Sequence, residues 1–356
     1  MKICVVTLAE KGGMIHYASQ LSQALAKYHQ VHLIVSDKAE IEDLEDVNMV
    51  KIPVPMEYMS SKLFSFLTLK RTINSLKPDL VHFTSTHPWL IAVAPLLSCP
   101  ITATIHDVKM HRGEWNPIWA FSQRVLINSS KKVFVHGPVA QKELIESGTP
   151  LEKISVVPHG DYSFFTQFEH EKMEEEDNIL FFGRILEYKG LEYLIRAKNF
   201  LKDEYPGLKL IIAGEGDIGP YLELINDKDG FELHNRFIPD EEVANFFQRS
   251  KMVVLPYKEG SQSGIIPIAY SFKKPVLSTR VGDIPEMVDD GITGILVPPC
   301  DCTALVGGIR KLISHDQLRK KMGENGYNKL MIENSWQKIA EHTTDSYREV
   351  MSHANP

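Results

Sequence analysis

The sequence has few cysteines and no paired cysteine motif. Its four cysteines, Cys4, Cys99, Cys300 and Cys302, are scattered over 356 residues, and the one close pair has the spacing C-D-C. This spacing is typical neither of a zinc ribbon nor of a thioredoxin-like redox centre. The number and spacing of the cysteines therefore indicate free thiols in a reducing cytosol and argue against a fold stabilised by disulfides.

Long apolar runs are also missing. The longest, "WLIAVAPLLSCPITATI", is interrupted by Pro95 and Pro100 and falls short of the roughly 20 residues that span a bilayer. The N-terminus turns polar after seven residues and so lacks the apolar stretch of a signal peptide. We therefore expect a cytoplasmic protein without a transmembrane anchor.

The chain as a whole has no excess of positive charge. The formal net charge is -7, which disfavours a general nucleic-acid-binding protein, because phosphate binding demands clustered positive charge. Residues 51–150 are a local exception, with 11 Lys and Arg against 6 acidic residues. This region is a candidate for contact with an anionic surface or acceptor.

What the sequence does contain is ordinary globular composition, with 43% hydrophobic and 24% charged residues, over a length that suggests two domains. Short β-branched runs such as "KICVVTL" and "KKVFVHG" alternate with amphipathic helical patterns. This alternation predicts two successive α/β domains, each a doubly wound parallel sheet covered on both faces. We predict a first domain over 1–165, a polar and acidic linker over 166–177, a second domain over 178–338 and a C-terminal helix over 339–356.

The stretch "FFGRILEYKG" places two cations where a predicted strand ends. Gly183 ends the strand, Arg184 follows at once, and Lys189 precedes a helix. Ligands of open α/β sheets bind beyond the carboxyl ends of the strands, and a diphosphate suits this pair of cations. The alternative is that both are solvated surface charges.

A second stretch, "EGSQSGIIPIAY", puts small residues between a strand and an apolar segment. Such a run lets successive backbone N–H groups point toward one anion at a helix N-terminus. It is equally compatible with a tight connection and no ligand. The candidate donor-binding residues here are Ser261, Gln262, Ser263, Gly264 and Ile265.

Three further places offer polar or flexible residues beside predicted strands. Gly12 and Gly13 separate the first strand from the first helix, without the full G-x-G-x-x-G that a nicotinamide dinucleotide site would show. His106 follows a buried strand directly, and a role in ligand contact competes there with a structural one. A later carboxylate, Glu286, is expected in a loop, where it would bind sugar hydroxyls or cap a helix.

These stretches together resemble glycosyltransferase family 4, a group of retaining, nucleotide-sugar-dependent enzymes with the GT-B fold. Matching blocks run through nearly the whole chain in the right order: the early Gly-Gly loop, "VVPHGDYSFF", "FFGRILEYKGLEYLIRA", "IIAGEGD", "FIPDEEVANFFQRS" and "KPVLSTRVGDIPEMVDDGITGILVPP". The resemblance implies two Rossmann-like domains facing a cleft, with the last helix crossing back to the first domain.

The resemblance also implies roles for individual residues. Arg184 and Lys189, with Gly183, match the pair that binds the diphosphate of the donor. Gly12 and Gly13 match the loop that approaches the donor from the first domain, and His106 matches a histidine near the transferred sugar. Residues Phe237 and Ile238 lie in the block that holds the nucleotide base.

One departure from the family pattern concerns two glutamates that many members carry eight positions apart. In this sequence the first position falls at Gly260, beside Glu259, and the second at Ile268. The "SQSG" form resembles a branch in which a serine-glycine turn holds phosphate instead. Glu286 then becomes a candidate for the ribose or sugar contact.

The implied reaction is transfer of a hexose from a nucleoside diphosphate sugar, UDP or GDP most readily, to a hydroxyl of a glycan, glycolipid or lipid-linked intermediate. No D-x-D motif stands at a strand end, so we expect neither a metal nor a cofactor. A sugar-nucleotide epimerase and a non-catalytic nucleotide-sugar-binding protein are the alternatives. Weaker expectations are acceptor contacts through His111 and Arg112, and peripheral contact with the inner face of the membrane through 56–78.

Overall fold

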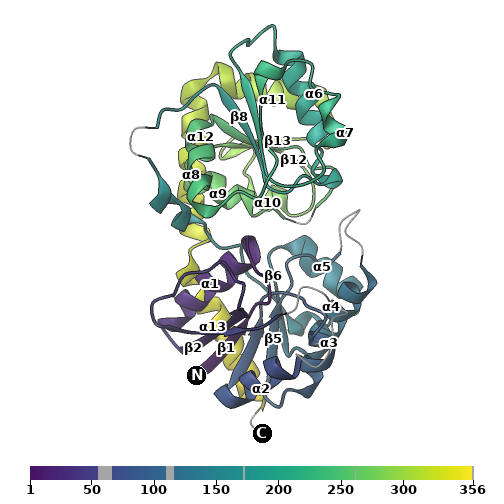
Figure 1. Ribbon diagram of the computed structural model, residues 1–356, viewed down its shortest axis with the longest axis vertical. Helices are drawn as coiled ribbons and strands as arrows, with labels where there is room; N and C mark the ends of the chain where they lie inside the picture. Colours follow the sequence, from purple (N-terminus) through teal and green to yellow (C-terminus); the bar gives the residue numbers. More distant parts are fainter. Residues whose placement is uncertain (55–65, 110–115, 171–172, 261, 355–356) are drawn as a thin grey trace. The chain divides into compact units, whose positions relative to one another are not determined.

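The computed structural model describes residues 1–54, 66–109, 116–170, 173–260 and 262–354. The chain divides into two compact units, which are described separately here (Figure 1). The first comprises Met1–Met110, Glu114–Gly160 and Ser335–Pro356, and the second His111–Gly113 and Asp161–Asn334.

The first unit is built on a seven-stranded parallel sheet with the order β3-β2-β1-β4-β5-β6-β7. Its strands are β1 (Lys2–Val6), β2 (Gln30–Ser36), β3 (Val47–Ile52), β4 (Leu80–Phe83), β5 (Ile101–Thr104), β6 (Lys132–Val135) and β7 (Ile154–Val156). Its helices are α1 (Gly13–Ala26), α2 (Phe66–Leu76), α3 (Leu90–Val93), α4 (Pro117–Ser129), α5 (Pro138–Glu146) and α13 (Trp336–Ala354), with 3-10 turns η1 (Ala94–Leu96) and η2 (Leu151–Lys153).

The second unit has a six-stranded parallel sheet with the order β10-β9-β8-β11-β12-β13. Its strands are β8 (Asn178–Phe182), β9 (Lys209–Ala213), β10 (Phe231–His234), β11 (Met252–Leu255), β12 (Val276–Thr279) and β13 (Gly294–Val297). Its helices are α6 (Leu191–Leu201), α7 (Gly219–Leu222), α8 (Asp240–Arg249), α9 (Ile265–Ser271), α10 (Ile284–Met287), α11 (Cys302–Ser314) and α12 (Asp316–Glu333), with η3 (Ser163–Phe168), η4 (Glu187–Lys189) and η5 (Lys228–Gly230).

Both sheets are buried on their two faces, as the continuous apolar strands predict. Along β1, Ile3 and Val5 enter one core cluster while Cys4 and Val6 enter another on the opposite face. In β8, the residues of Ile179–Phe182 alternate between two clusters in the same way. The predicted pair of doubly wound α/β domains is confirmed.

Strand order reverses once in each sheet, between β1 and β4 in the first unit and between β8 and β11 in the second. In open α/β sheets, ligands bind beyond the carboxyl ends of the strands at such a reversal. The loops that follow β1, β4, β8 and β11 are therefore the places where a site is expected.

The domain boundaries differ from the predicted ones, because the stretch taken as a linker belongs to the second unit. Phe165 in η3 is 2% exposed and lies in the core of that unit. The acidic residues that follow are held by cations, with Glu175 Oε1 2.6 Å from Arg319 Nη2 and Glu175 Oε2 2.8 Å from Lys274 Nζ. Acidic composition suggested a free linker, whereas these side chains neutralise buried cations.

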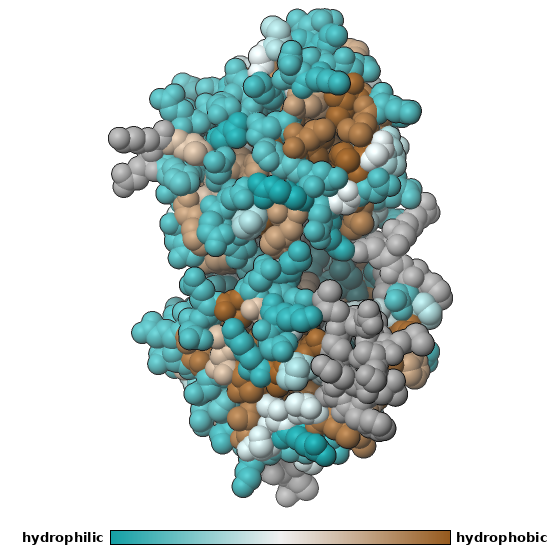
Figure 2. Space-filling model, viewed as in Figure 1, coloured by the Kyte–Doolittle hydropathy of each residue, from teal (hydrophilic) through white to brown (hydrophobic). Residues whose placement is uncertain are grey.

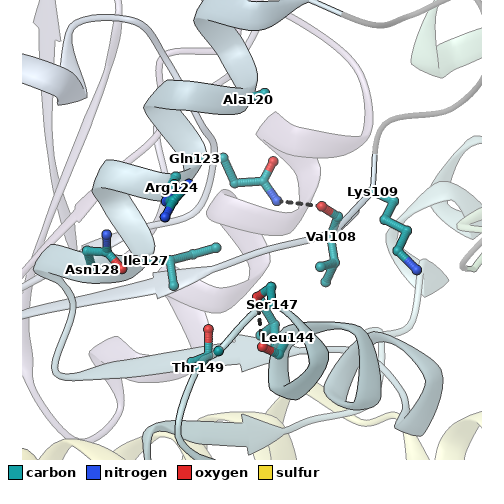
Figure 3. Close-up of a pocket in the computed structure, with 11 residues that line it drawn as sticks. Val108, Lys109, Ala120, Gln123, Arg124, Ile127, Asn128, Leu144, Ser147 and Thr149 are labelled. Atoms are coloured by element: carbon teal, nitrogen blue, oxygen red, sulfur yellow. Dashed lines mark hydrogen bonds between the residues drawn. The ribbon is translucent and has the colours of Figure 1, made fainter.

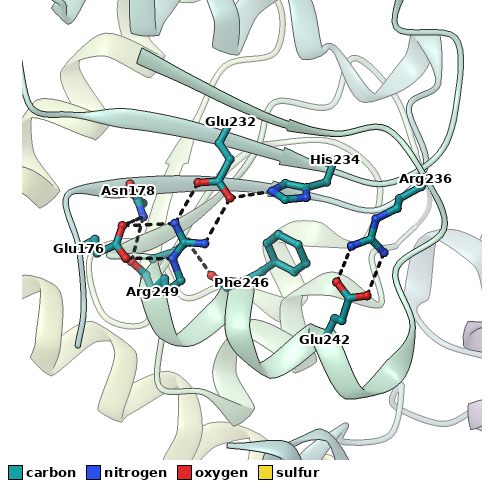
Figure 4. A network of polar contacts seen from close by, with 9 residues as sticks. Glu176, Asn178, Glu232, His234, Arg236, Glu242, Phe246 and Arg249 are labelled. Atoms are coloured by element: carbon teal, nitrogen blue, oxygen red, sulfur yellow. Dashed lines mark hydrogen bonds and ion pairs between the residues drawn. The ribbon is translucent and has the colours of Figure 1, made fainter. Parts of the chain in front are cut away.

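Ion pairs fix the end of this segment as well (Figure 4). Glu176 Oε1 lies 3.0 Å from Arg249 Nε, and the same guanidinium reaches Glu232 Oε2 at 2.9 Å. Glu232 in turn lies 2.6 Å from His234 Nε2. The network ties the entry to β8 to strand β10 and helix α8.

Figure 2 shows apolar surface in several places on each unit. One apolar patch lies near α6 and α7, which carry the exposed side chains of Phe200 and Leu222. Among the described residues, no helix is long and apolar enough to cross a membrane.

Part of the predicted membrane-contact segment, 56–78, lies outside the described residues. Its remaining part forms α2, whose Leu69 and Ile73 are fully buried in the core of the first unit. The apolar face of α2 therefore packs on its own sheet, as in an ordinary amphipathic helix of an α/β domain.

Candidate functional site

The carboxyl end of β8 carries the two predicted diphosphate-binding cations. Gly183 follows the strand with φ of 103°, a left-handed value that favours glycine. Arg184 is exposed at the next position, and η4 then brings the chain to Lys189. Gly190, with φ of 65°, ends this turn and starts α6.

Lys189 does not extend into solvent. Lys189 is 8% exposed, and its Nζ lies 3.1 Å from the position that a Cβ on Gly183 would occupy. The ammonium also lies 5.4 Å from the centre of the Tyr257 ring, a cation–π distance. The side chain thus turns back to the end of β8, where the sequence predicted a ligand.

The loop after β11 lies beside these cations in the fold. The Ile265 side chain lies 3.4 Å from the same Cβ position of Gly183. Ser263 is buried, and its hydroxyl lies 3.0 Å from the Tyr257 hydroxyl and accepts a hydrogen bond from the Ile265 N–H at 3.3 Å. Gly264 has an ordinary right-handed conformation, Gln262 is half-buried, and Ser261 lies outside the described residues.

A glycine-rich loop after β9 completes this region, which the sequence motifs did not predict as part of the site. Gly214 has φ of 147°, and a Cβ there would lie 2.1 Å from the carbonyl oxygen of Gly183. The neighbouring Ile185 N–H donates to the Glu215 carbonyl at 2.8 Å. The signal was present in "IIAGEGD", since paired glycines after a buried strand mark a close approach of two backbones.

The remaining predicted donor residues occupy different surroundings. Phe237 follows β10 and is half-buried, while the Ile238 side chain is part of the core. Glu286 was expected in a loop, but it lies in the first turn of the short helix α10 and is exposed. Its carbonyl accepts a hydrogen bond from Lys329 Nζ at 3.1 Å. The acid therefore occupies a helix N-terminus, the other possibility that the sequence allowed.

In the first unit, the glycines after β1 lie where the strand order reverses. Gly12 has φ of 75°, and its carbonyl accepts hydrogen bonds from the first turn of α1. A Cβ at Gly12 would meet no atom within 4 Å, so the backbone conformation rather than crowding requires glycine there. Gly13 is exposed as the first residue of α1.

His106 lies in a group of three histidines that follow neighbouring strands. His106 comes after β5, His136 after β6 and His159 after β7. Their ring centres are 4.8 Å apart for His106 and His136, 5.0 Å for His136 and His159, and 6.2 Å for His106 and His159. Of the three, His106 alone was a predicted site residue, although "TIHD", "FVHG" and "VPHG" each place a histidine just beyond a strand.

Burial makes all three imidazoles poor bases. It lowers the pKa of His106 to about 4, although the nearby charge of Asp107 opposes this shift. Burial also lowers the pKa of His159 to about 4, and that of His136 well below its ordinary value. At neutral pH the cluster is therefore uncharged, and His106 is not poised as a general base.

A hollow of about 720 Å³ lies between α4 and α5 of the first unit (Figure 3). Gln123 of α4 donates to the Asp107 carbonyl at 2.9 Å and to the Val108 carbonyl at 3.2 Å, and so holds the segment that follows His106. Arg124 supplies positive charge to the lining, whereas Lys109 Nζ is paired with Glu143 Oε1 at 3.0 Å. The predicted acceptor residues His111 and Arg112 lie outside the described residues.

Comparison with known proteins identifies the family to which the chain belongs. Residues 11–160 match the model described as Glycosyltransferase Family 4, and residues 163–329 match the model of glycosyl transferases group 1. A glycosyltransferase of Methanocaldococcus jannaschii that is named as uncharacterized is 23% identical, with 99% of each chain covered. The glycogen synthase of Mycobacterium tuberculosis is 26% identical over 79% of this chain and 72% of its own.

Solved structures agree on the fold. Sucrose-phosphate synthase from Thermosynechococcus elongatus superimposes with a TM-score of 0.80 at 19% identity, covering 99% of both chains. Anabaena HepE in complex with UDP and glucose gives a TM-score of 0.77 at 16% identity, covering 98% of this chain and 99% of its own. The chain is a glycosyltransferase of group 1 with the GT-B fold.

Proposed function

We propose that this glycosyltransferase transfers a hexose from a nucleoside diphosphate sugar to an acceptor hydroxyl with retention at the anomeric carbon, and that Arg184 and Lys189 bind the donor diphosphate. The observation that carries the proposal is the position of Lys189. Its ammonium lies against Gly183 at the end of β8, beside the point where the strand order reverses.

The two cations would contact a leaving diphosphate in different ways. Arg184 offers a planar fork for phosphate oxygens, and Lys189 offers a point charge. Because Lys189 is buried, its field is screened less than that of a surface lysine. Both would stabilise the negative charge that develops on the leaving nucleoside diphosphate.

The similar proteins guide the choice of donor. The solved structures of HepE are complexes with UDP, with UDP and glucose, and with UDP-glucose. Transfer of a sugar is also part of the names of several relatives, among them the D-inositol 3-phosphate glycosyltransferase of Paenarthrobacter aurescens. A UDP-hexose is therefore our first choice of donor and a GDP-hexose the second.

The proposed reaction takes place on one face of the sugar. The bond from the anomeric carbon to the β-phosphate oxygen breaks, and the bond to the acceptor oxygen forms on the same face. The acceptor proton passes to the leaving phosphate oxygen, so no basic side chain is required. This fits the low pKa of His106, which we place near the transferred sugar rather than in proton transfer.

The acceptor is proposed to be a glycan, glycolipid or lipid-linked intermediate that is bound by the first unit. The hollow between α4 and α5 supports this choice, because the exposed Arg124 in its lining would suit an anionic group on the acceptor. We also propose peripheral contact of the enzyme with the inner face of the membrane.

The experiment measures binding of UDP, GDP, ADP, dTDP and CMP to the native protein and to Arg184→Ala by calorimetry. Loss of a hydrogen bond to a charged group costs about 1.5–3 kcal/mol, which corresponds to a rise in Kd of roughly 10- to 150-fold. The matched control is Arg196→Ala, which removes an exposed arginine from α6 of the same unit. We expect one nucleoside diphosphate to bind native protein and control equally, and Arg184→Ala weakly.

Lys189→Met tests the buried cation while keeping the length of the side chain. Turnover of the corresponding nucleotide sugar, followed by NMR of the product, then reports both transfer and the anomeric configuration. Equal binding by Arg184→Ala and Arg196→Ala would remove the diphosphate assignment. Release of free sugar or an epimerised nucleotide sugar, in the presence of candidate acceptors, would overturn the transfer reaction.

A further inference from the structure

Tyr257 connects the two segments that carry the predicted phosphate-binding residues of the second unit. It follows β11, and its side chain is buried, with the residue 2% exposed. The centre of its ring lies 5.4 Å from Lys189 Nζ, and its hydroxyl lies 3.0 Å from Ser263 Oγ. One buried side chain therefore contacts the cation of η4 with its ring and the serine-glycine turn with its hydroxyl.

Contacts of the main chain hold Tyr257 in this position. The Thr279 hydroxyl of β12 donates to the Tyr257 carbonyl at 2.6 Å. The next residue, Lys258, donates its N–H to the carbonyl of Tyr188 in η4 at 2.7 Å. The segment that carries Tyr257 is thus bound both to the sheet of the second unit and to the turn that carries Lys189.

The surroundings determine which of the two hydroxyls donates. Burial raises the pKa of Tyr257 to about 12, so the phenol keeps its hydrogen at neutral pH. Within the described residues, Ser263 Oγ is the acceptor that this hydrogen can reach. A buried hydroxyl hydrogen without an acceptor is unfavourable. Tyr257 therefore donates to Ser263.

This assignment determines what the Ser263 hydroxyl can offer to a ligand. A serine oxygen can accept two hydrogen bonds and donate one. Ser263 Oγ accepts from Tyr257 and from the Ile265 N–H, the latter at 3.3 Å. In the part of the chain that the structure describes, no acceptor is left for the Ser263 hydrogen, which is therefore available to an oxygen of a bound molecule.

The Ser263 hydroxyl belongs to the same group of residues as the Lys189 ammonium. Ile265, whose N–H donates to Ser263, has its side chain 3.4 Å from the position that a Cβ on Gly183 would occupy. Lys189 Nζ lies 3.1 Å from the same position. A phosphate oxygen accepts from both a hydroxyl and an ammonium, and its charge strengthens both bonds.

We propose that Tyr257 is a positioning residue of the donor site, which orients the Ser263 hydroxyl toward a phosphate oxygen of the nucleoside diphosphate and supports the ammonium of Lys189 through its ring. This inference rests on the proposed function and extends it to a residue that does not touch the donor itself. The ring contributes a cation–π contact, which keeps the ammonium near the end of β8. Both effects act on phosphate, so a nucleoside without phosphate gains from neither.

Tyr257→Phe tests the hydroxyl, because it keeps the ring beside Lys189. Ser263 then loses the bond that orients its hydroxyl, and the Kd for UDP should rise roughly 2- to 10-fold, the effect of one neutral hydrogen bond. Ser263→Ala removes the donated hydrogen itself and should raise this Kd roughly 10-fold or more, because the acceptor is charged. Calorimetry with the full-length protein measures both values.

The double variant and a ligand without phosphate distinguish positioning from a merely structural role. Because Tyr257 acts through Ser263, adding Tyr257→Phe to Ser263→Ala should cause no further loss of UDP binding. Uridine, followed by ligand-observed NMR, should bind to the native protein and to these variants with the same Kd. GDP and guanosine are the second pair of probes.

The matched control is Tyr270→Phe. The Tyr270 hydroxyl is also buried in the second unit, and it donates to the Thr293 hydroxyl at 2.8 Å. This variant should bind UDP like the native protein, and urea unfolding establishes that both tyrosine variants are folded.

The outcomes separate this inference from the proposed function. Native affinity for UDP in Tyr257→Phe, an equal loss in Tyr270→Phe, or an equal weakening of uridine would overturn the role of Tyr257. The proposed function would still stand in these cases if Arg184→Ala weakened binding. Failure of the native protein to bind either UDP or GDP would overturn both.

Discussion

The hydroxyl of Tyr347 lies 2.8 Å from Nδ1 of His82, 265 positions earlier in the chain. Tyr347 belongs to the C-terminal helix α13 and is fully buried, and His82 belongs to β4 in the middle of the first sheet. The other ring nitrogen of His82 lies 2.8 Å from the Thr104 hydroxyl. One buried imidazole thus fastens the last helix to the core of the first unit.

Tyr347→Phe should lower the free energy of unfolding by about 1–2 kcal/mol, because it removes a buried hydrogen bond and leaves a histidine nitrogen with fewer partners. Tyr28→Phe is the control, since the Tyr28 hydroxyl also reaches α13, at Glu341, but in an exposed position. Urea unfolding should show little change for Tyr28→Phe. Equal effects of the two substitutions would contradict the argument from burial.

Stability should fall in mild acid because of the buried histidines. Burial lowers the pKa of His82 to about 3 and those of His87, His106 and His159 to about 4. An unfolded histidine binds its proton near pH 6.5, so the folded state loses stability as pH falls from about 6.5 toward 4. Urea midpoints measured from pH 7.5 to pH 4.5 should decline over this window.

Replacement of His82 tests whether the buried histidines cause the loss of stability in mild acid. His82→Gln should be less stable at pH 7.5 but should lose less additional stability between pH 6.5 and pH 4.5 than the native protein. A parallel decline in both proteins would show that other groups cause the acid sensitivity.

Gly214→Ala should damage the site loops without removing any polar group. The new Cβ would lie 2.1 Å from the Gly183 carbonyl oxygen, at a φ of 147° that side chains rarely adopt. We expect a loss of about 2 kcal/mol or more in stability and weaker nucleotide binding. Gly207→Ala, whose Cβ meets no atom within 4 Å, should leave both measurements unchanged.

Glu175→Gln should destabilise the second unit, because it removes charge next to buried cations. Arg319 is 1% exposed and keeps only Asp316 as a charged partner in the variant, while Lys274 loses its contact with Glu175. Loss of hydrogen bonds to charged groups at this partly exposed carboxylate costs about 1.5–3 kcal/mol. The control is the neighbouring exposed residue, Glu174→Gln, and denaturant unfolding compares the two.

Metal removal tests how the diphosphate of the donor is neutralised. If Arg184 and Lys189 neutralise the diphosphate, transfer should continue in the presence of EDTA. Added Mg²⁺ or Mn²⁺ should then have no lost activity to restore. Recovery with Mg²⁺ or Mn²⁺ would instead place a divalent ion on the diphosphate.

The sequence by itself determined the two parallel sheets, because continuous apolar strands between amphipathic helices must be covered on both faces. It also placed Gly183, Arg184 and Lys189 at a strand end, since strand, glycine and cation are adjacent in the chain. Composition failed at 166–177, where acidic residues resembled a linker. Their role depends on cations far along the chain, such as Arg319 and Lys274.

Only the tertiary structure decided which strand ends meet. His106, His136 and His159 form a cluster because β5, β6 and β7 are neighbours in one sheet, and no local pattern states that adjacency. The same holds for Gly214 against Gly183 and for Tyr347 on His82. Each contact joins segments whose sequences are compatible with many partners, and sheet order and packing select the one that forms.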